Sequence, residues 1–195
     1  MYGKRVGTSQ FSLQLNDVYA EFEDIPQYLY QDHEMMSSVF LAIDKNSKMK
    51  DVRDILFKLR LSNVRKAVFL SGDSINSFLK TERGLGISLS SITEEEWRVY
   101  SPSSPPILGA LKLKSIIDDG NFQLIRLIHD QLFFDSVRIE RDQLESQLIQ
   151  NFFEKPNTLT VLVYDQNSHY ESYVLSLDKI YATYTKFRDL MSEQD

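Results

Sequence analysis

The chain has 195 residues, of which 42% are hydrophobic and 26% are charged, so it suits one medium domain or two small ones with a proper core. Its net charge is -6 at pH 7, and no Lys/Arg cluster exceeds two or three residues. Phosphate binding needs concentrated positive charge, so we expect no nucleic-acid partner. We interpret Arg60, Arg65 and Lys66, the nearest approach to a basic patch, as a solvated rim.

The chain contains no cysteine, which excludes disulfides, thiolate metal sites and cysteine nucleophiles. No apolar run approaches the roughly 20 residues needed to cross a bilayer. No apolar segment follows Met1–Val6, so we see no signal peptide. We therefore expect a chain that is soluble as given, or the soluble part of a longer membrane protein.

The first elements are predicted from hydrophobic periodicity. Phe11–Leu15 alternates apolar and polar residues, as a half-buried strand does. An apolar stripe from Val18 to Leu29 predicts a helix that ends or kinks near Pro26. The short apolar run Ser38–Ile43 is typical of a strand that is buried on both faces.

A strand–helix–strand unit follows. Asp44–Ser47 has the composition of a turn, and Ser47 is our candidate for the helix N-cap. The next helix is the clearest in the chain, with an apolar stripe from Met49 to Leu59, and Lys66–Ser71 then returns as a buried strand. Such a unit predicts two parallel strands joined by a right-handed crossover.

The middle of the chain, from Gly72 to about Ser115, is less regular, and its proline-containing run Tyr100–Pro106 is the best candidate for a domain boundary. We expect short strands there at Gly86–Leu89 and Trp97–Tyr100. Regular patterns then resume, and they predict three further strands and two helices: strands at Phe122–Ile128, Leu132–Phe134 and Leu159–Tyr164, and helices at Ile139–Phe153 and Tyr170–Met191.

One pattern occurs twice. Val39–Met49 and Thr160–Tyr170 each contain an apolar strand, the sequence Asp-x-Asn-Ser, one polar residue and a bulky residue, and each leads into a long amphipathic helix. We therefore predict an α/β (α+β) fold of two similar lobes, each a small mixed sheet with two helices packed on one face. The expected lobes are residues 1–75 and 116–195, joined by an irregular connection over residues 76–115.

On these residues the sequence resembles the periplasmic domain of the ExbD/TolR family of biopolymer-transport proteins. The resemblance runs through the strand and turn of Val39–Met49, the helix of Val52–Arg60 and the return strand of Asn63–Phe69. A second match, Val137–Leu190, has the preceding helix, the strand, the Asp165 turn and the last helix, but lacks a clear return strand.

The resemblance implies a non-enzymatic, extracytoplasmic interaction module of a proton-gradient-coupled biopolymer transport system. It also implies a homodimer at the periplasmic face of a membrane, with a polytopic membrane channel partner if the chain is anchored. The family's N-terminal transmembrane helix, with its proton-carrying aspartate, has no counterpart in this sequence. We therefore expect the soluble segment of an anchored protein, or a relative that kept only the fold. The alternative is a stand-alone soluble protein that binds a small ligand or peptide between two α/β lobes.

Short motifs of catalytic or binding type are present but incomplete. Gly72-Asp73-Ser74 follows an apolar strand, as the nucleophile loop of GDS-type hydrolases does, but the downstream motifs of that family are missing, and we interpret it as a turn. Gly84-x-Gly86 is too sparse for a phosphate-binding loop. We therefore predict no catalytic and no cofactor-binding residues, and no cofactor.

Metal binding is also not expected. The histidines, His33, His129 and His169, are isolated in sequence and fit no zinc spacing. Asp118–Asn121 lacks the alternating carboxylates of a calcium loop, and Glu94–Glu96 resembles the first turn of a helix.

Five tyrosines crowd the last predicted strand and helix: Tyr164, Tyr170, Tyr173, Tyr181 and Tyr184. Those of the helix fall on two neighbouring stripes. One stripe can then be core and the other an amphipathic contact surface, or the whole helix is a half-exposed core helix.

Overall fold

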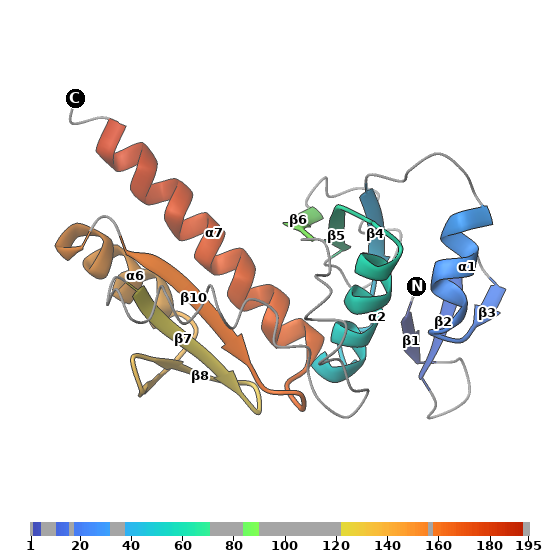
Figure 1. Cartoon of the computed structure of the whole chain (residues 1–195). Coiled ribbons are helices and arrows are strands. Elements are labelled where there is room, and N and C mark those ends of the chain that lie inside the picture. The colour runs from blue at the N-terminus through green and yellow to red at the C-terminus, as the bar shows by residue number, and fades with distance from the viewer. Residues whose placement is uncertain are drawn as a thin grey trace. The chain divides into compact units, whose positions relative to one another are not determined.

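The computed structural model describes residues 2–4, 11–15, 18–31, 38–70, 84–89, 122–155 and 158–192. The chain forms two compact units. The first unit comprises Met1–Leu108 and His169–Glu171, and the second comprises Gly109–Ser168 and Ser172–Asp195. In chain order the elements of the first unit are β1 (Tyr2–Lys4), β2 (Phe11–Leu15), β3 (Val18–Ala20), α1 (Asp24–Gln31), β4 (Ser38–Ala42), α2 (Met49–Leu61), β5 (Lys66–Leu70) and β6 (Gly84–Ser88) (Figure 1).

The described strands of the first unit form two small sheets. β1, β2 and β3 make an antiparallel meander, while β4 pairs with β5 in parallel and β5 pairs with β6 antiparallel. A parallel bridge between Tyr2 and Ile43 connects β1 to the residue that follows β4. The predicted β4–α2–β5 unit with parallel strands is therefore confirmed.

Helix α2 forms because its apolar residues recur on one face. Met49, Val52 and Ile55 are all buried, as spacings of three residues on a helix allow. The helix ends at Leu61, and Asn63, two residues later, is in the left-handed conformation with a φ of 60°. The N–H groups of Asn63 and Val64 donate to carbonyl oxygens of the last turn, which satisfies groups that a helix end leaves unpaired.

The predicted start of α2 needs correction. Lys48 occupies the N-cap position and makes no side-chain capping bond. Ser47 is fully buried, and its hydroxyl has no hydrogen-bond partner among the described residues. Ser47 is therefore not the N-cap, because the turn places the serine one residue too early and points it inward.

The prediction of a helix from Val18 to Leu29 is wrong in its first half. Val18 pairs with Leu15 as part of β3, and α1 begins only at Asp24. Pairing with β2 makes Val18–Ala20 a strand and not a helix. A segment of three residues is too short for its hydrophobic periodicity to distinguish the two. Pro26 lies in the first turn of α1, where its missing N–H costs no intrahelical bond, so it does not end the helix.

Two expectations about burial in the first unit are also wrong. Phe40 in the middle of β4 is exposed, so β4 is not buried on both faces. Arg60 on α2 is buried, so it does not belong to a solvated rim with Arg65 and Lys66. Its long aliphatic stem suits it to a partly apolar site.

The second unit contains β7 (Phe122–Ile128), β8 (Gln131–Phe134), β9 (Val137–Ile139), α6 (Gln143–Glu154), β10 (Leu159–Tyr164) and α7 (Tyr170–Ser192). Its sheet has the order β10-β7-β8-β9, with β10 parallel to β7 over six residue pairs and the other pairs antiparallel. The predicted helix at Ile139–Phe153 begins too early, since Ile139 ends β9 and α6 begins at Gln143.

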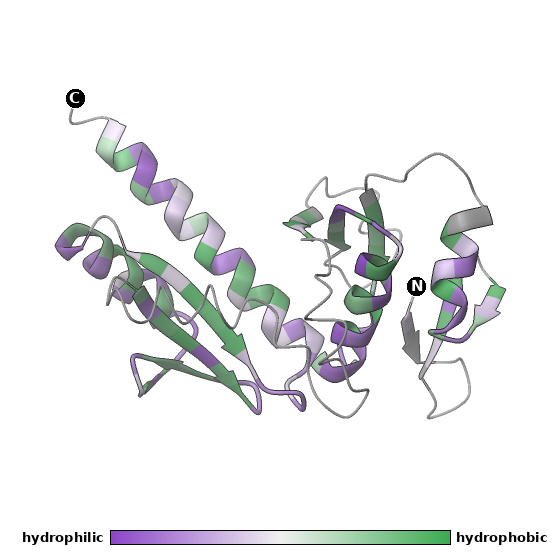
Figure 2. Cartoon of the chain, viewed as in Figure 1, coloured by the Kyte–Doolittle hydropathy of each residue, from purple (hydrophilic) through white to green (hydrophobic). Residues whose placement is uncertain are grey.

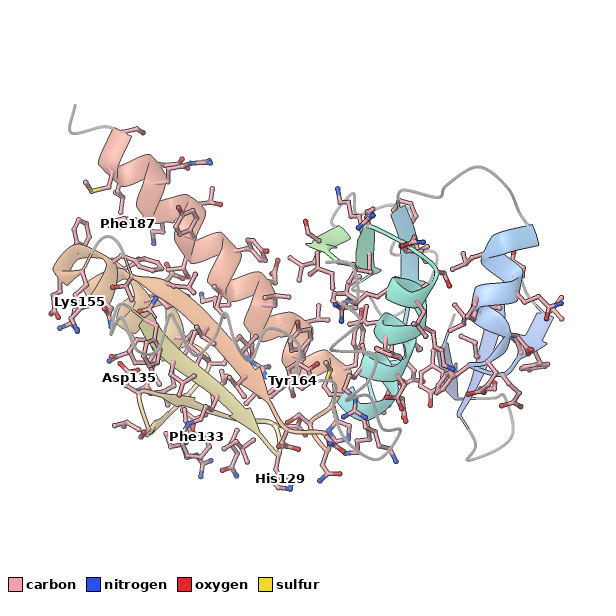
Figure 3. The ribbon with its side chains drawn as sticks, viewed as in Figure 1. His129, Phe133, Asp135, Lys155, Tyr164 and Phe187 are labelled. Carbon is pink, nitrogen blue, oxygen red and sulfur yellow. The ribbon has the colours of Figure 1, made fainter. Side chains whose placement is uncertain are left out.

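The core of the second unit lies on one face of this sheet. Alternate residues of β7 and β8 point to that face, and α6 and α7 supply the covering side chains (Figures 1 and 3). The buried cluster consists of Ile125, Leu127, Leu132, Phe134, Leu144, Leu148, Phe152 and Phe187.

The predicted fold class, mixed α+β with small mixed sheets, is confirmed. Within the described ranges, no helix combines the length and apolarity that a membrane crossing requires.

Candidate functional site

The turn after β10 is a polar site of the second unit with several hydrogen bonds to one carboxylate. Asp165 Oδ1 accepts from the N–H groups of Asn167 at 2.6 Å and Ser168 at 3.0 Å. Its Oδ2 accepts from the N–H of His129 at 2.5 Å and lies 3.0 Å from Ser168 Oγ. The carboxylate thus joins the turn to the β7–β8 hairpin, which is far away in sequence.

The hydrogen bonds of Asp165 set its ionisation. Partial burial opposes the charged form, but the donors from His129, Asn167 and Ser168 outweigh that effect and hold the pKa of Asp165 below its usual value. The carboxylate is therefore charged at neutral pH, and each donor gains a charged acceptor.

A serine, a histidine and an aspartate meet here, but their arrangement is not that of a catalytic triad. Ser168 Oγ is fully buried and interacts with Asp165 and with the carbonyl oxygen of Leu127 at 3.3 Å. The His129 side chain is 71% exposed at the tip of the β7–β8 hairpin, and its Nδ1 lies 3.8 Å from Asp165 Oδ2 (Figure 3). A nucleophile needs access to substrate, which the fully buried Ser168 lacks. The cluster orders the strand–helix connection.

The turn after β4 in the first unit has two bonds that correspond to those of the Asp165 turn. Asp44 Oδ1 accepts from the N–H of Asn46 at 2.8 Å, and the N–H of Ser47 donates to the Asp44 carbonyl oxygen at 2.9 Å. In the second unit the N–H of Ser168 likewise donates to the carbonyl oxygen of Asp165, at 3.3 Å. Both serines are fully buried.

Each turn is also bonded to the first described strand of its own unit. The N–H of Asp44 donates to the carbonyl oxygen of Tyr2 at 2.7 Å, and that of Asp165 donates to Leu127 at 3.0 Å. In both cases the residue before the aspartate pairs in parallel with that same strand residue. Two segments of similar sequence thus make corresponding bonds within their own units.

The helices that precede β4 and β10 begin alike. The N–H of Asp24 donates to the carbonyl oxygen of Glu21, while the Asp24 carboxylate accepts from the Glu21 N–H at 2.8 Å. Gln143 and Glu140 make the corresponding pair of bonds, with the side-chain bond at 2.9 Å. In each pair the side chain of the later residue accepts from the N–H three residues earlier, which is one half of a capping box, and the other bond joins backbone groups.

Several sequence candidates lie outside the described residues: Gly72-Asp73-Ser74, His33, Glu94–Glu96, Trp97–Tyr100 and Asp118–Asn121. Gly84 and Gly86 belong to β6, and His169 has its Nε2 at 2.9 Å from Lys48 Nζ within the first unit. In the part of the chain that the structure describes, no group of three His, Cys, Asp or Glu side chains is placed to hold a metal ion.

The tyrosines of α7 divide between core and surface. The ring of Tyr173 packs on that of Tyr164, with centroids 5.0 Å apart, and burial, followed by the neighbouring Tyr164 and Tyr181, raises the pKa of Tyr173. Tyr181 and Tyr184 are about half exposed, although the Tyr184 ring still touches Phe152 edge-on. Exposed aromatic side chains of this kind are enriched in protein interfaces.

An ion-pair cluster fastens α7 to α6. Glu145 Oε2 lies 2.5 Å from Lys179 Nζ, and Glu145 Oε1 lies 2.7 Å from Lys186 Nζ. Hydrogen bonds from Lys179 and then Lys186 lower the pKa of Glu145 to about 2.

The sequence predicted the strand at Leu159–Tyr164 but not its exposure. Among the described strands, β10 lies at the edge of its sheet, and its Leu159 and Val163 are 45% and 41% exposed. Figure 2 shows this strand coloured as hydrophobic over most of its length. The lack of a return strand after the last helix was the signal that could have identified this edge.

Comparisons of the chain with protein-family models, with curated proteins and with solved structures found no match.

Proposed function

We propose that the chain is a non-enzymatic interaction module of the ExbD/TolR type, which acts at the periplasmic face of a membrane in a proton-gradient-coupled biopolymer transport system. The observation that carries this proposal is the Asp44 turn with α2 and the parallel return strand β5 behind it. This is the segment on which the sequence resembles the family, and its order of elements is the one that the resemblance implies.

The second unit supports the proposal independently. Its meander, helix, parallel strand and Asp165 turn follow one another in the same order as in the first unit. The chain uses one arrangement twice, with a buried serine and a hydrogen-bonded carboxylate at each turn. We infer that these polar groups stabilise the fold. Binding surfaces, such as that around Tyr181 and Tyr184, are then left to perform the function.

A photo-crosslinking experiment in the organism of origin tests this function. A photoreactive phenylalanine analogue replaces Tyr184, and Val18 on β3, which is also well exposed, serves as the control position. We expect the analogue at position 184 to form an adduct with a polytopic membrane protein, and a protonophore to change the adduct yield.

Two results would contradict the proposed function. One is that the adducts contain no membrane protein at either position. The other is that the yield at position 184 does not respond to the protonophore, because coupling to a proton gradient requires the contact to depend on it.

A further inference from the structure

The sheet of the second unit has apolar side chains on both of its faces. α6 and α7 cover the face that carries the core cluster, and alternate strand residues point to the opposite face, which we call the open face. On β7 and β10 the apolar residues of the open face are Phe122, Leu124, Ile128, Leu159, Val161 and Val163. Three of them, Ile128, Leu159 and Val163, are between 37% and 45% exposed. Parallel strands are usually buried on both faces, so this composition suits a face that a partner covers.

The open face also carries two arginines. Arg126 on β7 pairs across the sheet with Phe133 on β8, and Phe133 pairs in turn with Arg138 on β9, so the three side chains form one row. Phe133 lies on the side of the sheet away from Phe187 (Figure 3). Neither arginine makes an ion pair or a hydrogen bond with another described residue, and the Nε–H of Arg126 is buried without an acceptor. Unpaired charged donors are unfavourable at a partly apolar surface, so this row favours an acceptor from a partner.

The strands supply no negative charge to this row. Their residues on the open face include no aspartate or glutamate, although the whole chain has a net charge of -6. Asp135, in the turn between β8 and β9, accepts from the N–H of Leu124 at 3.1 Å. The strands of the open face are therefore apolar and locally positive, which complements a segment that is apolar and acidic.

We propose that the open face binds an acidic amphipathic helix of a partner protein. Neighbouring strands lie about 4.8 Å apart and a helix with its side chains is about 10–12 Å wide, so one helix covers β10 and β7 together. The apolar stripe of that helix would meet Leu124, Val161 and Val163. Carboxylates on the flank of the helix would then reach Arg126 and Arg138, which lie toward the β9 side of the sheet.

The charge of the chain favours a protein partner over an anionic membrane. Membrane recognition of this kind normally uses clusters of about four to eight Lys or Arg residues. The open face has two arginines in its strands, and a chain of net charge -6 is repelled by an anionic surface. The inference concerns a different surface from that around Tyr184, and it holds whether or not the proposed function is correct.

The first experiment selects a ligand from a defined pool. The immobilised whole chain is panned against a phage-displayed library of random peptides of about 16 residues, a length at which a helix can form on binding. Phage that also bind a variant carrying both Arg126→Gln and Arg138→Gln are removed. We expect the enriched peptides to have apolar residues at spacings of three and four, with aspartate or glutamate beside them.

The second experiment measures affinity, with the most enriched peptide labelled with fluorescein as the probe. In fluorescence anisotropy, Arg138→Gln should raise the Kd at least about tenfold, because a charge-assisted hydrogen bond is lost. The matched control is Arg188→Gln on α7, where the arginine side chain is 69% exposed, and it should leave the Kd unchanged. Circular dichroism melts establish that each variant is folded.

Three outcomes would overturn the inference. The first is that no peptide is enriched on the wild type over the double variant. The second is that the enriched peptides lack acidic residues, or bind a folded Arg138→Gln variant as tightly as the wild type. The third is that the chain binds vesicles of phosphatidylglycerol and phosphatidylcholine and loses that binding in Arg138→Gln, which would assign the open face to an anionic membrane surface. None of these results bears on the contact at Tyr184 that tests the proposed function.

Discussion

Replacing Asp165 with asparagine tests the structural role of the turn after β10. Asparagine retains one oxygen and presents an NH₂ group in place of the other. That NH₂ group must face either the N–H of His129 or the N–H groups of Asn167 and Ser168. At least one donor then meets another donor, and the remaining bonds lose a charged acceptor.

The magnitude follows from these bonds. A hydrogen bond to a charged group contributes about 1.5–3 kcal/mol, but the bonds from His129 and Asn167 are exposed, so water can partly replace the lost acceptor. We therefore expect Asp165→Asn to lower the free energy of unfolding by about 1–3 kcal/mol, which is a sizeable part of the roughly 5–15 kcal/mol typical of native proteins. Urea unfolding followed by circular dichroism at pH 7 measures it.

The matched control is Asp189→Asn, the same chemical change at a side chain that is 64% exposed and pairs with Arg188 at 3.7 Å. Exposed ion pairs contribute little, so we expect a change within about 0.5 kcal/mol. Two results would contradict the structural role of Asp165. One is a free energy of unfolding of Asp165→Asn within about 0.5 kcal/mol of the wild-type value, and the other is an equal loss of free energy in the two variants.

The pH dependence gives a second measurement on the same variant. The pKa of Asp165 in the folded chain lies below its ordinary value of 3.8, so ionised Asp165 stabilises the fold above pH 3.8. This contribution is lost as the pH falls through the folded-state pKa. The stability difference between wild type and Asp165→Asn should therefore narrow below pH 3.8, and a constant difference would contradict the assigned bonds.

Three further predictions concern the packing, charge and turns of the second unit. Leu148→Ala removes a fully buried side chain from the core cluster and should lower the unfolding free energy by about 2–5 kcal/mol in urea titrations. Glu145→Gln should lower the melting temperature above pH 4.5, because Lys179 and Lys186 depress the pKa of Glu145 in the folded chain. In thermal melts, the difference in melting temperature between this variant and the wild type should vanish as the pH falls to about 2. Ser136→Gly should stabilise by about 0.5–1 kcal/mol in the same melts, because Ser136 has a φ of 78° that glycine adopts without strain.

Each of these has a matched control and a contrary outcome. Leu175→Ala on the exposed side of α7 should change stability by less than about 0.5 kcal/mol, and an equal loss at both leucines would show that the core is misplaced. Glu171→Gln should not reproduce the pH profile of Glu145→Gln. Ser172→Gly inside α7 should destabilise, and a loss of stability at Ser136 as well would contradict the left-handed turn.

Long elements with a clear period could be predicted from the sequence. The predictions of a helix over Tyr170–Met191 and of parallel strands on either side of α2 were both correct, because many residues contribute to each hydrophobic pattern. The strands β1, β3 and β9 have three residues each, and such segments become strands only through pairing with distant partners. Local sequence does not contain that information.

The candidate site was predictable in part for the same reason. The Asp-x-Asn-Ser pattern indicates a turn, since asparagine and aspartate side chains accept from the backbone N–H two residues on. The hydrogen bond from His129 to Asp165 requires β10 to pair with β7. That pairing joins segments that are distant in sequence, so the local pattern does not predict it. The exposure of Leu159 likewise depends on which of the described strands pair with β10.

The parallel pairing of β7 with β10 has a consequence for the order of folding. β8 and β9 follow β7 through two-residue turns, whereas Phe122 meets Leu159 only after β9 and α6 have intervened. Closing a short loop costs less entropy than closing a long one, so we expect the meander to form first and β10 to join it last. A nascent chain that has not yet reached Leu159 therefore presents an unpaired β7 edge, and synthesis past Tyr164 is the step that closes it.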